Sequence, residues 1–295
     1  MNKILLFFTA ILLYRTSIAQ TSYVWNGTTS TSFTTNTNWT PNGVPGAADN
    51  ITIVTGANNC ILSGNTTVTN LTITSGVLNL NGFTLNTTGV VACNGGNCNN
   101  GTFNSTATSL TFAGTTFGAN ITANVNDVYF NGSTFNGSVT VTKNSASNIQ
   151  STGNNVFNGV TSITNAGTGY LLLTNGAAGR NETFNASTTF NTTNTGALYI
   201  GYQRNVAFNA NVTVNNPTST GLIQIGRVGT VTLNTGNTIT CGTFAGAALN
   251  LYNLSQTGST ALSLSPGSSG AVNIYGSSIN GSLTINAGII TAQTS

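Results

Sequence analysis

Apolar and polar residues alternate in short stretches that recur along the chain, and the clearest of these is a five-residue frame. The frame starts at Gly169, Gly196, Gly221, Ala247 and Gly270, so successive copies begin at intervals of 27, 25, 26 and 23 along the chain. The third and fifth residues of every copy are aliphatic, and in a strand two such residues point to one face. The pattern therefore predicts strands with core-facing side chains at Leu198 and Ile200, Ile223 and Ile225, Leu249 and Leu251, and Val272 and Ile274.

A second signal, an apolar residue followed by Asn, comes after the frame at Phe184, Phe208, Leu233 and Ile279, and occurs earlier at Phe130, Phe135 and Phe157. Two or three short strands in roughly 25 residues, separated by Gly-rich corners, are typical of one parallel β-helix coil, whereas a propeller blade needs about 40 residues. A β-sandwich does not repeat such a frame, and the spacing of leucine-rich repeats is missing. We therefore predict an all-β fold, a single right-handed parallel β-helix (β-solenoid) of roughly ten coils with Asn ladders at its corners.

The same pattern divides the chain into three segments. Residues 1–19 combine Lys3, an apolar run over 4–13 and small residues at Ser17 and Ala19, which predicts a signal peptide and a secreted or extracellular cell-surface location. Residues 20–50 hold both tryptophans, Trp25 and Trp39, and are expected to cap the open end of residues 51–295, the β-helix repeats. The alternative for these two rings is stacking on a carbohydrate.

Charge and candidate chemistry narrow the function. Charged residues make up 3% of the chain and the net charge is +3 with the leader included, which excludes nucleic acid as a main partner and a polybasic membrane patch. No apolar run reaches the length of a membrane span, so membrane insertion is not expected. The only acids are Asp49, Asp127 and Glu182, and there is no His. We therefore expect no enzyme, no cofactor and no metal site.

The four cysteines lie in the exported part of the chain. Cys93 and Cys98 flank the turn sequence Asn-Gly-Gly-Asn, which favours a local disulfide between them. Cys60 and Cys241 would lie about 7.5 coils apart, roughly 36 Å along a straight rod. We expect these two thiols to be buried and unpaired with each other.

Two sets of outward-facing residues each allow two interpretations. Arg180, Arg204 and Arg227 follow one another at steps of 24 and 23 along the chain, which predicts either an exposed ion-pair ladder with Glu182, the favoured alternative, or a stripe that contacts an acidic polysaccharide. Thr-x-Thr at 72–74 and 140–142 suggests a third function, an ice-binding surface, which we rank lower because the motif does not recur once per coil.

The C-terminal stretch over 282–291 alternates like the earlier coils, and no proline or charge protects its edge. It predicts end-to-end association of the chain with itself into filaments, or packing against neighbouring repeats of a longer chain.

A resemblance is carried by W-N-G at 25–27, N-W-T-P-N-G-V-P-G at 38–46 and D-N-I-T-I at 49–53, and by the strings at 134–143 and 167–176. These resemble exported Thr/Asn/Gly-rich repeat proteins of bacterial surfaces, many of them adhesin-like parallel β-helices. The resemblance implies a surface location and no assigned catalytic residues. The expected function is a non-catalytic structural or adhesive β-solenoid. The alternative is a carbohydrate-binding module or a degenerate polysaccharide-lyase-like β-helix, with surface glycans as partners.

Overall fold

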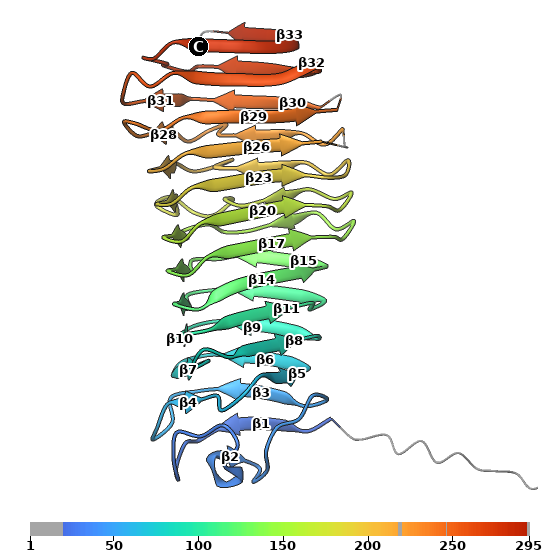
Figure 1. The fold of residues 1–295 in the computed structure, drawn as a ribbon, viewed down its shortest axis with the longest axis vertical. Helices are drawn as coiled ribbons and strands as arrows, with labels where there is room; N and C mark the ends of the chain where they lie inside the picture. The colour runs from blue at the N-terminus through green and yellow to red at the C-terminus, as the bar shows by residue number, and fades with distance from the viewer. Residues whose placement is uncertain (1–19, 218–219, 246, 294–295) are drawn as a thin grey trace, which may run out of the picture.

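The chain forms a rod of stacked parallel coils, about 11 turns in all, in a computed structural model that describes residues 20–217, 220–245 and 247–293 (Figure 1). The predicted signal peptide lies outside the described residues. The only helix among the described residues is a single 3-10 turn, η1 (Asn36–Asn38). The prediction of an all-β parallel β-solenoid is therefore confirmed.

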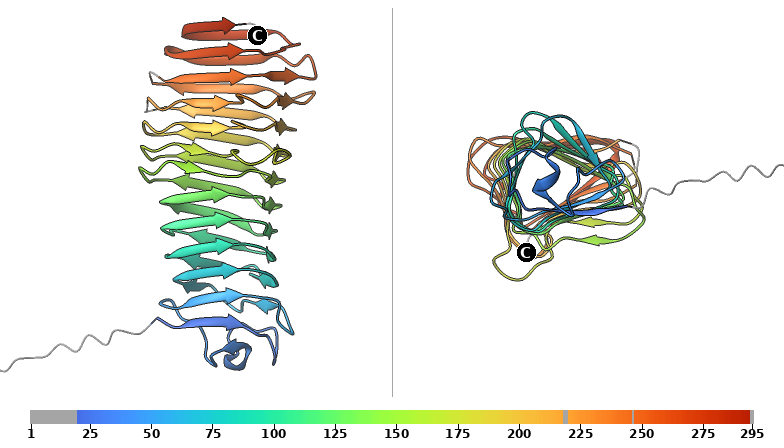
Figure 2. Two further views of the ribbon diagram at one scale, coloured as in Figure 1. Left: turned by 180° about the vertical axis from the view of Figure 1, so that it is seen from behind. Right: turned by 90° about the horizontal axis from the view of Figure 1, so that it is seen from below.

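Each coil contributes strands to three faces, which run the length of the rod (Figures 1 and 2). Face 1 contains β1 (Ser22–Trp25), β3 (Asn50–Ile53), β6 (Asn70–Ile73), β9 (Val90–Cys93), β12 (Ser109–Phe112), β15 (Asp127–Phe130), β18 (Ile149–Gln150), β21 (Leu171–Leu172), β24 (Leu198–Ile200), β27 (Ile223–Ile225) and β30 (Ala248–Tyr252). Face 2 contains β4 (Cys60–Ile61), β7 (Val77–Asn79), β10 (Asn97–Asn99), β13 (Thr116–Phe117), β16 (Thr134–Phe135), β19 (Val156–Phe157), β22 (Glu182–Phe184), β25 (Val206–Phe208), β28 (Val231–Leu233) and β31 (Leu254–Gln256).

Face 3 contains β5 (Thr66–Val68), β8 (Thr84–Thr87), β11 (Thr102–Ser105), β14 (Asn120–Val125), β17 (Val139–Lys143), β20 (Thr161–Asn165), β23 (Thr188–Thr192), β26 (Val212–Asn216) and β29 (Ile239–Phe244). Two long strands, β32 (Leu262–Tyr275) and β33 (Leu283–Gln293), turn the corner between face 3 and face 1. The first part of β32 pairs with β29 and its last part with β30, which is why the two faces join into one 16-stranded sheet.

The five-residue frame sets the register of face 1 in the second half of the rod. Leu198 pairs with Ile223, which pairs with Leu249, and that residue pairs with Val272. The fifth frame positions stack in the same way, and all eight predicted frame residues are buried. The aliphatic columns predicted from the sequence are therefore confirmed.

The length of a coil changes along the rod. Ile121 pairs with Val139, a step of 18 in residue number, whereas Leu171 pairs with Leu198, a step of 27. The regular interval that the frame shows thus holds only for the second half of the chain. Shorter coils in the first half account for about 11 turns where roughly ten were predicted.

Face 2 carries two ladders side by side. Inside the rod, the rings of Phe135, Phe157 and Phe184 stack with centroids 4.7 and 4.6 Å apart. Outside, the Asn after each phenylalanine donates its amide to the Asn of the preceding coil, with Nδ2–Oδ1 distances of 2.7 Å for Asn158 to Asn136 and for Asn185 to Asn158. The amide ladder continues through Asn209 and Asn234. The predicted Asn ladder is thus present on this face.

The N-terminal end of the rod begins within the segment expected to be a cap. β1 pairs in parallel with β3 and so belongs to the stack of face 1. The short strand β2 (Trp39–Thr40) pairs antiparallel with β1 on its outer side. Trp39 and Thr40 therefore pair with part of the edge that β1 would otherwise expose.

Candidate functional site

The tryptophans predicted as sugar contacts are both inside the N-terminal end. Trp25 is 1% exposed and Trp39 is 0% exposed, and their rings pack edge to face with centroids 5.0 Å apart. The indole of Trp25 donates to the carbonyl of Asn58, and the indole of Trp39 donates to the carbonyl of Phe33, each at 2.8 Å. Neither ring offers a face on which a sugar could stack, so the carbohydrate alternative is wrong for both.

The four cysteines are free thiols, and the disulfide predicted between Cys93 and Cys98 is not formed in this structure. Cys93 ends β9 and Cys98 lies in β10, both buried in the core, so the turn sequence between them serves as a corner from face 1 to face 2. Burial raises the pKa of Cys98 to about 12 and holds the pKa of Cys93 well above its usual range, with a further contribution from Cys98. Cys60 is buried as predicted, whereas Cys241 is half-buried. Such thiols are inert packing groups at neutral pH.

The three arginines lie in the corner loops from face 1 to face 2 of three successive coils. The Arg204 Nε donates to the carbonyl oxygen of Gly176 at 2.9 Å. The Arg180 side chain lies against the same glycine, so closely that a Cβ atom on Gly176 would contact the Arg180 Cδ. The Arg227 guanidinium carbon lies 4.6 Å from the ring centroid of Tyr202. The structure therefore brings the three predicted residues together at one corner.

The ion-pair ladder predicted for these arginines is wrong, because Glu182 points into the core. It is 1% exposed and pairs in register with Val206, which occupies the same inward position one coil later. Asn155 donates to Glu182 from its side chain at 2.9 Å and from its backbone at 3.2 Å. Burial raises the pKa of Glu182 to about 8 despite these hydrogen bonds, so the group is largely neutral at pH 7.

Three tyrosines that are not among the predicted site residues lie beside the arginines. Tyr170, Tyr199 and Tyr202 are half-buried, with centroid distances of 5.8 Å from Tyr170 to Tyr199 and 5.1 Å from Tyr199 to Tyr202. The signal was available, because the second and fourth positions of the frame point outward and hold Tyr170 and Tyr199. Together with Arg204 and Arg227 they form a surface that we call the Tyr–Arg corner.

The remaining charged groups do not join this corner. Lys143 ends β17 and is buried, and its Nζ donates to the carbonyl oxygens of Ser145 at 2.8 Å and Gly169 at 3.0 Å. Burial lowers the pKa of Lys143, and the nearby Asp127 carboxylate opposes that shift. Asp127 begins β15 at the corner from face 3 to face 1, whereas Glu182 begins β22 at the corner from face 1 to face 2. The acids therefore do not form the facing carboxylate pair that glycoside hydrolysis uses.

Face 3 carries a hydroxyl array on its outward side. One hydroxyl stands at the same register position in each coil from β14 to β33, at Thr122, Thr140, Ser162, Thr189, Thr213, Thr240, Ser263 and Thr284. The Thr-x-Thr motif itself does not recur once per coil, because in this array only Thr140 and Thr142 carry it, and Thr72 lies in β6 on face 1. What does recur in each coil is a single hydroxyl, and unequal coil lengths hide that repeat in the sequence.

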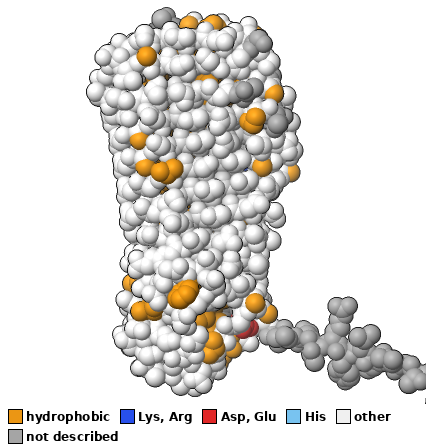
Figure 3. All heavy atoms as spheres, in the orientation of Figure 1, with side chains coloured by type: hydrophobic (Ala, Val, Ile, Leu, Met, Phe, Trp, Pro, Cys, Tyr) orange, Lys and Arg blue, Asp and Glu red, His pale blue; other side chains and the backbone are white. Residues whose placement is uncertain are grey.

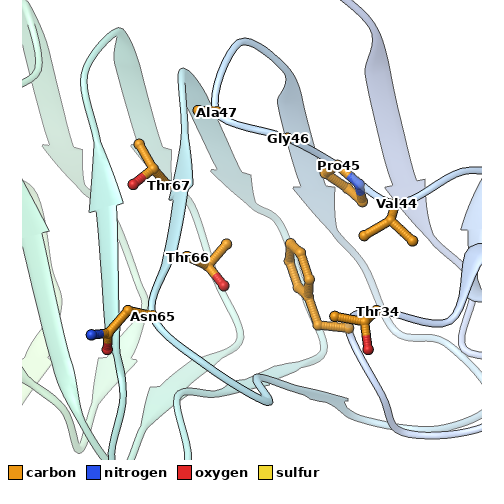
Figure 4. A pocket seen from close by; sticks show the side chains of 9 residues that line it. Thr34, Val44, Pro45, Gly46, Ala47, Asn65, Thr66 and Thr67 are labelled. Atoms are coloured by element: carbon orange, nitrogen blue, oxygen red, sulfur yellow. The ribbon is translucent and has the colours of Figure 1, made fainter.

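A pocket of about 360 Å³ opens near the N-terminal end, between the 44–47 loop and β5. Figure 4 shows Val44 and Pro45 on one side of it and Thr66 and Thr67 on the other. Phe33 and Asn65 contribute to its lining, and no lining residue titrates. The pocket can hold a small neutral molecule by contact and hydrogen bonding, but it carries no group for acid–base chemistry.

Within the described ranges, no three His, Cys, Asp or Glu side chains gather closely enough to hold a metal ion. The same residues include no helix with the length and apolar character that a membrane crossing requires. A comparison with protein-family models found no match, and searches of curated proteins and of solved structures also found none. The resemblance to bacterial surface repeat proteins is therefore supported at the level of a parallel β-solenoid alone.

Proposed function

We propose that the chain is a non-catalytic, exported structural or adhesive element of a bacterial surface. The observation that carries the proposal is a rod stabilised along its length by in-register ladders, with an outer surface that is almost free of charge (Figure 3). Its acids are separated, because β6, β9 and β12 lie between the strands that follow Asp49 and Asp127, and Glu182, the most buried of them, lies at another corner and is hydrogen-bonded within the core. Such a rod is suited to spanning a distance and presenting a surface.

Self-association is part of this proposal, and β33 supports it. Among the described residues β33 pairs with β32 alone, which leaves its other edge open. Leu283 and Ile290 continue the inward columns of Leu262 and Val272, yet they are 40% and 53% exposed. A second copy that adds its own β33 would satisfy the edge and cover this apolar end. Two chains that pair through their β33 edges form a closed dimer. In a filament, the β33 of one chain would instead pair with the β1 of the next, where it would take the place of β2.

Replacing Leu283 and Ile290 with Lys is expected to abolish this association. Both side chains are largely exposed in the single chain, so the charges repel a second copy without entering a closed core. Sedimentation velocity of the purified chain over a hundredfold concentration range measures the effect, and a discrete dimer or a ladder of masses distinguishes closed from open assembly. Ile289→Lys is the matched control, because Ile289 is 64% exposed and lies outside the inward columns. A monomeric wild-type chain at high concentration would contradict the proposal.

Carbohydrate binding is a second candidate function, favoured by the Tyr–Arg corner. Half-exposed tyrosine rings provide flat amphipathic surfaces, and arginine donates to carboxylate or sulfate groups in a planar fork. With Glu182 largely neutral at pH 7, the Tyr–Arg corner carries two arginines, with Arg180 in the loop of the preceding coil, and no ionised acid from its own loops. An acidic polysaccharide is the ligand that this combination fits.

Tyr202→Ala and Arg227→Gln are each expected to weaken binding to an acidic polysaccharide about tenfold, since they remove a ring face and a stacked cation. Affinity electrophoresis with polygalacturonate, dextran sulfate and neutral dextran measures the effect and separates carboxylate from sulfate recognition. Tyr129→Ala is the matched control, because Tyr129 is a half-buried tyrosine on β15 of the same face, two strands before β21. Equal binding by wild type and both variants would contradict this function.

A further inference from the structure

The first polar column of face 3 is the hydroxyl array from Thr122 to Thr284 described above. A second column, of amides as well as hydroxyls, stands two residues later in β14, β17, β20, β23 and β26. Its members are Asn124, Thr142, Thr164, Asn191 and Asn215. Adjacent strands are about 4.8 Å apart and alternate residues of one strand about 6.6 Å apart. The array is therefore a two-dimensional lattice of polar groups with a regular repeat in both directions.

The parallel strands hold this lattice in place. From β14 to β26 each outward residue stands between two buried neighbours, as Thr140 does between Val139 and Val141, and this burial holds the strand backbone in place. Asn215 donates to Asn191 at 3.1 Å within the second column, which fixes the amides relative to each other. In the described part of the chain, the hydroxyls of Thr122, Thr140 and Thr189 have no hydrogen-bond partner in the protein, and they remain available to an external one.

The composition of the array decides which ligand fits. The outward positions of β14, β17, β20, β23 and β26 hold Thr, Ser and Asn only, with no charged and no aromatic side chain. An ionic ligand would find no counter-charge, and a flat sugar chain would find no ring to stack on. The remaining candidate is a ligand whose own surface repeats hydrogen-bonding groups at spacings of the same order as those of the array. Frozen water presents such a surface.

We propose that face 3 is an ice-binding surface. The threonine methyl groups and hydroxyls together order a layer of water in the spaces between columns, and that layer joins the ice lattice. Because the protein array is rigid before binding, the ordering of side chains costs little at the moment of adsorption. The near absence of charge on the rod also lowers the free-energy cost of removing water from its surface on adsorption.

The test uses the full chain, exported by its own leader and purified, with ice as the probe. A polycrystalline ice front is grown slowly through a dilute solution, and the protein fraction incorporated into ice is compared with that of an inert globular protein. We expect at least fivefold enrichment of the wild type, and thermal hysteresis measured on single crystals. Thr140→Lys combined with Thr189→Lys is expected to reduce incorporation to the level of the inert protein.

Thr232→Lys is the matched control, because Thr232 is a half-buried outward threonine of β28 on face 2 and lies outside the array. It should leave incorporation unchanged, and circular dichroism of all variants checks that the fold is retained. Sedimentation with microcrystalline cellulose provides a further arm. Incorporation at the level of the inert protein, loss of incorporation in the face 2 control, or binding to cellulose without binding to ice would each overturn the proposal.

Discussion

Replacing Ile225 with Asp is expected to prevent folding of the rod. Ile225 is 1% exposed and stands in the inward column between Ile200 and Leu251, its register partners in the neighbouring coils. A carboxylate at this position has only aliphatic neighbours above and below, and an unpaired buried charge costs several kcal/mol even after relaxation. Since that is a large share of the stability of a typical domain, the variant should fail to accumulate as folded protein.

The measurement is the yield of soluble protein, followed by circular dichroism of any protein recovered. Thr232→Asp is the matched control, because it places the same charge on an outward position of a nearby strand and should accumulate at the yield of the wild type. Ile225→Val keeps the experiment quantitative, since a lost methylene in the column should lower the free energy of unfolding by about 1 kcal/mol. Normal yield and an unchanged spectrum for Ile225→Asp would show that the column assignment is wrong.

The fold could be predicted from the sequence because each coil repeats one local rule. Aliphatic residues at the third and fifth frame positions can be buried together only if the copies stack in register, and stacking requires a solenoid. The number of coils could be predicted only roughly, because the loops between the faces vary in length. The corner from Leu172 to Glu182 is longer than the one from Ile200 to Val206, and loop length costs little in stability.

The candidate site was harder to predict, for a related reason. The arginines were found because a charged residue is conspicuous in a chain with 3% charged residues. Acidic side chains are usually solvated, so the sequence alone favours a surface position for Glu182, the expected partner of the arginines. Only the strand register shows that Glu182 occupies the inward position that Val206 occupies in the next coil. The hydroxyl array does not appear in the sequence as a fixed period, because its members are unequally spaced along the chain. The step from Ser162 to Thr189 is much longer than the step from Thr122 to Thr140.

The dependence of stability on pH should reveal the burial of Glu182. Its folded-state pKa is raised to about 8 from an ordinary value of 4.5, so between these pH values the folded chain binds more protons than the unfolded chain. The free energy of unfolding must then fall as pH rises through this window, by up to roughly 1.4 kcal/mol for each pH unit. Between pH 5 and pH 8 the loss should reach about 3.5 kcal/mol. The chain has no His, so few other side chains titrate in this range.

Glu182→Gln should remove this dependence and make the protein more stable than wild type at pH 8. The glutamine cannot ionise, and its carbonyl can still accept the amide hydrogen of Asn155 that Glu182 accepts at 2.9 Å. Urea unfolding followed by circular dichroism at pH 5, 6.5 and 8 gives the free energies for both proteins. Asp127→Asn is the matched control, because it removes an acid at another corner and should leave the slope of the wild type in place. Parallel curves for wild type and Glu182→Gln would mean that Glu182 is ionised in the folded rod, and that the corner beside the arginines carries a negative charge after all.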